Sequence, residues 1–159
     1  MAVSRETLQD IAAERQLQPA TLERVATRVG AIYSASPAVS GEGVVYESIG
    51  DGRYQLERWH AEQRETYSFE GEAFHPSVAA TGSAIYFELV ADGHSRIMRY
   101  EPAAKSLATV ISRSFEPTHP AVSPDEHRVA FLSGTRIMIY ASGAPDALDV
   151  GSPVHEVVA

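Results

Sequence analysis

The sequence predicts a mainly β protein, in which three consecutive four-stranded units follow a short helical hairpin. Up to Gly30, apolar residues recur at the three- and four-residue spacing of an amphipathic helix. After Gly30 the pattern changes to short runs of β-branched and aromatic residues, separated by clusters of glycine, aspartate, serine and proline. This second pattern occurs three times, and the internal repeat is the strongest support for the predicted fold.

Residues 1–30 contain the signals of two short helices. Ser4 is a suitable N-cap for the first helix, and Pro19 suits the first turn of the second, which ends near Gly30. We expect this hairpin to act as a cap on the repeats or as an adaptor. It loosely resembles a helix-turn-helix, but it is electrically neutral and has no basic recognition face.

Each repeat begins with a proline that is followed by a short apolar run. The three prolines are Pro37, Pro76 and Pro120, which are 39 and 44 residues apart. This period matches one four-stranded blade of a β-propeller. We therefore predict that residues 31–159 form three blades. Their approximate bounds are 33–72, 73–115 and 116–159.

Turn signals place the strands inside each repeat. Asp51-Gly52 and Asp92-Gly93 each stand between two strand-like runs, and Asp-Gly favours the tight turn whose twist suits a β-hairpin. Gly134 has this role in the third copy. The predicted third strands are residues 53–60, 95–101 and 135–141, and the predicted fourth strands are 65–69, 107–112 and 147–150.

The third copy carries the most complete motif. It reads Pro-Ala-Val-Ser-Pro-Asp at residues 120–125, and two apolar runs follow at 129–131 and 137–140. This arrangement resembles the repeat of the TolB-like β-propeller family, although Glu126 stands where that repeat usually has glycine. The resemblance covers roughly three quarters of the chain. It implies propeller blades and leaves the activity open.

Three blades are fewer than the about four to eight that usually close a propeller ring. We therefore expect the chain to be part of a longer propeller, or to form a homodimer in which two chains complete six blades. An open arc with covered ends is the less favoured arrangement.

Composition limits the classes of function. The formal net charge is −8, and the acidic excess lies on the repeats because residues 1–30 hold four arginines and four acids. An acidic surface repels phosphate backbones, which disfavours nucleic acid as a partner. The absence of cysteine excludes disulfides and thiol nucleophiles. No signal peptide or membrane-spanning run occurs, so the chain as written is expected in the cytoplasm, or in the periplasm if an export signal was removed.

The candidate ligand-binding residues are two histidines and two acids in the second and third copies. His75 and His119 each precede the first proline of a repeat, and Glu70 and Glu116 lie upstream of them. We expect these side chains near the mouth of the central channel, where they could bind an anionic ligand or a divalent metal that the sequence does not specify. The competing interpretation is a turn in which each imidazole bonds a backbone carbonyl. Ser36 takes the histidine position in the first copy, by alignment.

The favoured function is non-catalytic binding of a protein or a small-molecule ligand, with no cofactor. The sequence contains no Gly-x-Ser-x-Gly elbow and no phosphate-binding glycine loop. One alternative is a metal-assisted lyase or hydrolase that uses the two histidines. The other is a regulator whose N-terminal helices serve as a helix-turn-helix-like adaptor.

Overall fold

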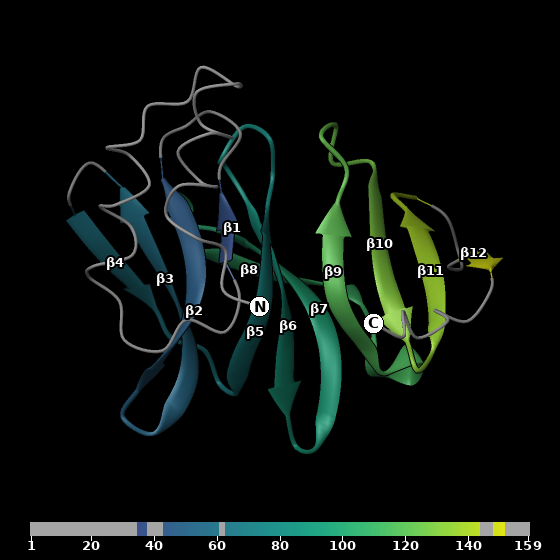
Figure 1. Ribbon diagram of the computed structural model, residues 1–159, viewed down its shortest axis with the longest axis horizontal. Coiled ribbons are helices and arrows are strands. Elements are labelled where there is room, and N and C mark those ends of the chain that lie inside the picture. Colours follow the sequence, from purple (N-terminus) through teal and green to yellow (C-terminus); the bar gives the residue numbers. More distant parts are fainter. Residues whose placement is uncertain (1–34, 38–42, 61–62, 144–147, 152–159) are drawn as a thin grey trace, which may run out of the picture. The chain divides into compact units, whose positions relative to one another are not determined.

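The computed structural model describes residues 35–37, 43–60, 63–143 and 148–151, which form three antiparallel sheets of four strands each (Figure 1). The predicted mainly β architecture is therefore confirmed. The predicted helical hairpin at residues 1–30 lies outside the described residues. Within the described part of the chain, no helix has the length and apolar character that crossing a membrane requires.

In each sheet the strands follow one another in sequence order and pair with their neighbours. The first sheet contains β1 (Ala35–Pro37), β2 (Val44–Gly50), β3 (Arg53–His60) and β4 (Gln63–Tyr67). The second contains β5 (Glu72–Val78), β6 (Ile85–Ala91), β7 (His94–Glu101) and β8 (Ser106–Ile111). After the 3-10 turn η1 (Arg113–Phe115), the third contains β9 (Pro117–Val122), β10 (Arg128–Ser133), β11 (Arg136–Ala141) and β12 (Leu148–Gly151).

In the first two sheets, the hairpins between the second and third strands have the turn geometry that the sequence predicts. Asp51 and Gly52 have φ values of 51° and 76°, and Asp92 and Gly93 have 55° and 75°. Positive φ at both central residues is the mark of the type I′ turn, which matches the twist of the flanking strands. The turns therefore fix the register of β2 with β3 and of β6 with β7.

The hydrophobic core lies between successive sheets. Tyr86 and Phe131 belong to the cluster that joins the second and third sheets, and Phe87 belongs to the cluster between the first and second. These aromatic residues fill the space between successive sheets. The second strands also bury acidic side chains, since Glu47 on β2 and Glu88 on β6 are only 2% and 6% exposed.

Two serine hydroxyls link the innermost strands of neighbouring sheets. The Ser36 Oγ accepts a hydrogen bond from the backbone amide of Val78 at 3.1 Å, and the Ser77 Oγ accepts one from the amide of Val122 at 3.0 Å. Ser36 is therefore equivalent to Ser77. The alignment of Ser36 with His75 was wrong, because Ser36 pairs with Val45 on β2 as Ser77 pairs with Tyr86 on β6.

Candidate functional site

His75 and His119 lie inside the innermost strands β5 and β9, rather than before them as the sequence suggested. The ladder between β5 and β6 shifts register between Phe74 and Ser77, and the ladder between β9 and β10 shifts at the corresponding point. The two histidines have φ values of 49° and 51°. This left-handed conformation is uncommon for residues other than glycine, so both His-Pro pairs are strained bulges that turn the side chain out of the regular ladder.

The bulges bring the two imidazole rings into contact across neighbouring sheets. The ring centroids of His75 and His119 are 3.6 Å apart, and the ring planes are inclined by 24°. The His75 Nδ1 lies 2.9 Å from the Glu88 Oε2, and the His75 backbone amide donates to the Glu47 Oε2 at 3.0 Å. The described contacts of the His75 ring are thus with the Glu88 carboxylate, the His119 imidazole and the Phe74 ring, so the turn interpretation with a carbonyl partner does not describe it.

The cluster contains two buried acidic side chains next to the histidines. Glu47 and Glu88 are almost fully buried, whereas His119 is exposed. Among the described residues, no arginine or lysine forms an ion pair with either carboxylate. The hydrogen bond that the His75 ring makes to the Glu88 carboxylate raises the pKa of His75, and this effect outweighs the opposing effect of burial. Although much of the His119 side chain is exposed, the atoms packed around it partly desolvate the ring and lower its pKa, and electrostatic interaction with His75 lowers it further.

We expect the two histidines to affect the pH dependence of stability in opposite directions. The pKa of His75 in the folded protein lies above the ordinary value of 6.5. Its contribution to the free energy of unfolding is therefore fully present below pH 6.5 and is lost as the pH rises through the folded pKa. The pKa of His119 in the folded protein lies below 6.5. Its contribution to the free energy of unfolding is therefore fully present above pH 6.5 and is lost as the pH falls through the folded pKa. Urea unfolding from about pH 5 to pH 8, in buffer with a chelator, tests this pattern.

In that series, His75→Asn should flatten the alkaline side of the stability profile, and His119→Asn should flatten the acidic side. Asparagine is the appropriate replacement because it tolerates positive φ better than most residues. Profiles that neither substitution changes would contradict the assignment.

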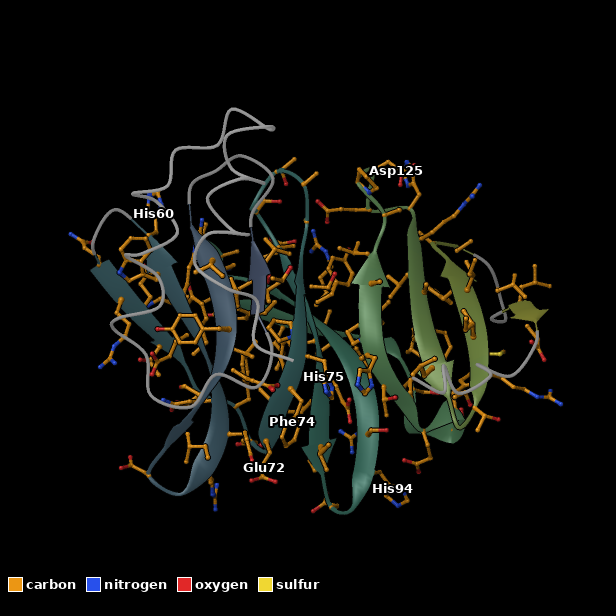
Figure 2. All side chains as sticks on the ribbon, viewed as in Figure 1. His60, Glu72, Phe74, His75, His94 and Asp125 are labelled. Carbon is orange, nitrogen blue, oxygen red and sulfur yellow. The ribbon has the colours of Figure 1, made fainter. Side chains whose placement is uncertain are left out.

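The two predicted acids lie away from the histidine pair. The Glu116 carboxylate is 2.7 Å from the His94 Nδ1, and it accepts hydrogen bonds from the backbone amide and the hydroxyl of Ser95. Figure 2 shows His94 at the end of the β6–β7 hairpin, distant from His75. Glu70 is an exposed residue between β4 and β5, and no described contact joins it to the cluster.

The sequence interpretation missed Glu47 and Glu88, which are the acids that do meet the histidines. A signal for them was present, because each follows an aromatic residue within a run that is mostly apolar. An acid at the same place in two copies of a buried strand indicates a specific partner, since an unpaired buried charge is costly.

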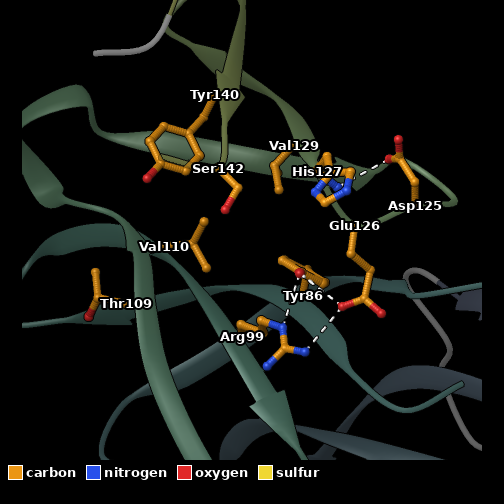
Figure 3. Close-up of a pocket in the computed structure, with 10 residues that line it drawn as sticks. All are labelled: Tyr86, Arg99, Thr109, Val110, Asp125, Glu126, His127, Val129, Tyr140 and Ser142. Atoms are coloured by element: carbon orange, nitrogen blue, oxygen red, sulfur yellow. Dashed lines mark hydrogen bonds and ion pairs between the residues drawn. The ribbon is translucent and has the colours of Figure 1, made fainter. Parts of the chain in front are cut away.

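A second feature is a cavity of about 450 Å³ between the second and third sheets (Figure 3). On its wall the Arg99 Nε donates to the Tyr86 hydroxyl at 3.1 Å, and its guanidinium also pairs with Glu126 at 3.2 Å. Glu126 has a φ of 58°, which explains why glycine is usual at this place in the repeat. The turn here is stabilised by the Asp125 carboxylate, which accepts a hydrogen bond from the His127 amide at 3.1 Å.

Successive four-stranded antiparallel sheets that pack face to face, with strands in sequence order within each sheet, define the blades of a β-propeller. The chain has a TolB-like β-propeller fold, as comparison with solved structures shows. It matches the structure of TolB from Acinetobacter baumannii with a TM-score of 0.65 and 16% identity, over 75% of this chain and 32% of that one. A putative TolB from Agrobacterium tumefaciens matches with a TM-score of 0.68 and 17% identity, over 77% of this chain and 50% of that one.

Proteases also occur among the structures with this fold. The β-propeller domain of the Trilobed protease from Pyrococcus furiosus matches with a TM-score of 0.57 and 12% identity, over 80% of this chain and 44% of that one. The chain thus spans 32% to 50% of the length of these three structures. No protein-family model and no curated protein matches the sequence. Identities this low establish the fold alone.

Proposed function

We propose that this chain is a non-catalytic binding module, which holds a ligand at the cluster of His75, Glu88 and His119. The observation that carries the proposal is the contact between two imidazoles on successive innermost strands, 3.6 Å apart beside a buried carboxylate. In a propeller the innermost strands line the central channel. A ligand at this cluster would therefore lie on the channel wall, whether a longer chain or a homodimer completes the ring.

Backbone strain supports this proposal. Two residues of the same type adopt the same uncommon φ at equivalent places in two blades, and each precedes a proline. Such strain costs of order 1–3 kcal/mol per residue and tends to occur at functional sites. The exposed ring of His119 gives a ligand access, while the buried Glu88 fixes the orientation of His75.

A thermal-shift series tests the proposal with defined probes: citrate, inorganic phosphate, uronic acids and divalent cations. A ligand at 100 times its dissociation constant stabilises the folded state by about 2.7 kcal/mol. At least one probe is expected to raise the Tm of the wild type and of His94→Asn, and to leave the Tm of His119→Asn unchanged. His94→Asn is a matched control because it alters another imidazole that contacts a carboxylate.

The proposal fails if no probe stabilises the protein, or if His119→Asn responds as the wild type does. Recovery of the bound probe after long incubation separates binding from turnover. Cleavage of an organic probe that depends on His119 would favour the lyase or hydrolase alternative instead.

A further inference from the structure

We propose that the ligand of this cluster is a divalent transition-metal ion of the zinc type, bound by His75, Glu88 and His119. This inference rests on the proposed function, because it names what the same cluster binds. One donor atom from each of the three side chains can be chosen so that all lie within 4.8 Å of one another. These side chains come from three strands, β5, β6 and β9, so the bound ion would join the second and third sheets.

The donor set suits zinc. Two imidazoles and one carboxylate form a ligand set that zinc commonly uses, and three protein ligands leave a fourth position for water or for a further ligand. Imidazole favours zinc, copper, iron and nickel, whereas calcium and magnesium prefer sites made of oxygen ligands. The cluster therefore discriminates against the two abundant hard cations.

Binding requires a modest rearrangement that the structure allows. Zinc–nitrogen bonds of about 2.0–2.1 Å place tetrahedral donors about 3.4 Å apart, so the donor atoms must approach one another. Glu88 is buried, and the Glu47 carboxylate holds the backbone of His75 at 3.0 Å, so these two groups provide the fixed side of the site. His119 is exposed, and its ring can turn out of the stack to complete the site.

Charge balance supports the same conclusion. Glu47 and Glu88 place two carboxylates in a buried region where, among the residues the structure describes, no lysine or arginine pairs with them. A divalent ion held by the two imidazoles and Glu88 would place a cation beside these buried acids, and buried carboxylates are normally paired or coordinate a metal.

Zinc titration of the full 159-residue chain by calorimetry tests the inference, after chelator treatment and without a histidine tag. We expect one zinc ion per chain for the wild type and for His94→Asn, and an affinity at least about tenfold lower for His119→Asn. Calcium should produce no saturable heat. His94→Asn matches the substitution chemistry, but the imidazole that it removes has no second imidazole beside it among the described contacts.

A second measurement does not depend on the variants. In proton–nitrogen spectra of the wild type, zinc should shift the ring nitrogens of His75 and His119 and leave those of His94 in place. The inference is overturned if zinc does not bind at one ion per chain, if His119→Asn binds it equally well, or if the His94 ring responds and the pair does not. If zinc fails while an organic probe stabilises the protein in a His119-dependent way, the proposed function stands without the metal. If no probe depends on His119, both are wrong.

Discussion

Phe87→Ala is expected to lower the free energy of unfolding by about 3–5 kcal/mol, because truncation of a buried aromatic residue removes apolar contacts and leaves a cavity. Phe87 is fully buried in the cluster that joins the first and second sheets. Its ring centroid lies 4.5 Å from that of Phe69, which follows β4. The substitution therefore removes contacts between two sheets, and urea unfolding measures the loss.

The matched control is Ile49→Ala on β2, where the side chain is 52% exposed. Its effect should stay within about 0.5 kcal/mol, as for most surface substitutions. A loss below about 1.5 kcal/mol for Phe87→Ala would show that the sheets do not depend on this interface for stability.

Gly71→Ala is expected to lower the free energy of unfolding by about 1–3 kcal/mol from backbone strain alone. Gly71 connects the first sheet to the second and has a φ of 147°, a region that is nearly exclusive to glycine. An added Cβ would also lie 2.6 Å from the carbonyl oxygen of Val90, which belongs to the backbone of β6 and cannot easily move. Strain and overlap act together, because relief of one requires a shift of β5 against β6.

Gly93→Asn provides the comparison for Gly71→Ala in the same urea series. Gly93 has a φ of 75°, which asparagine tolerates, and an added Cβ there would meet no atom within 4 Å. We expect a loss of less than about 1 kcal/mol. Equal losses for the two variants would show that chain entropy, rather than the close approach to Val90, determines the effect.

The sheet architecture was predictable because local signals define it. The third strand of the first blade was predicted at 53–60 and is observed as Arg53–His60, because an Asp-Gly turn precedes it. The fourth strand was predicted at 65–69 and is observed as Gln63–Tyr67, two residues earlier. The latter strand lies at a sheet edge and has four exposed residues, so no alternation of burial marked its start.

The candidate site was only partly predictable. His75 and His119 could be paired from the repeat alone, since equivalent residues of neighbouring blades lie close together. Glu88 was not found because its contact with His75 depends on the register of β5 with β6, and a bulge shifts that register between Phe74 and Ser77. Glu116 was grouped with the histidines because it lies close to His119 in the sequence. In the structure its backbone has a φ of 43°, and its carboxylate contacts His94 at the β6–β7 hairpin rather than the histidine pair.

The left-handed backbone at His75 and His119 has a consequence for any mutational scan of this chain. At these positions β-branched residues would be depleted and glycine and asparagine retained, even in a protein that bound nothing, because the bulge alone selects against a branched Cβ. If valine and isoleucine are the only residues depleted at these two positions, the scan therefore reports on folding. Loss of asparagine and glycine at both positions, under selection for binding, would report on the imidazoles themselves.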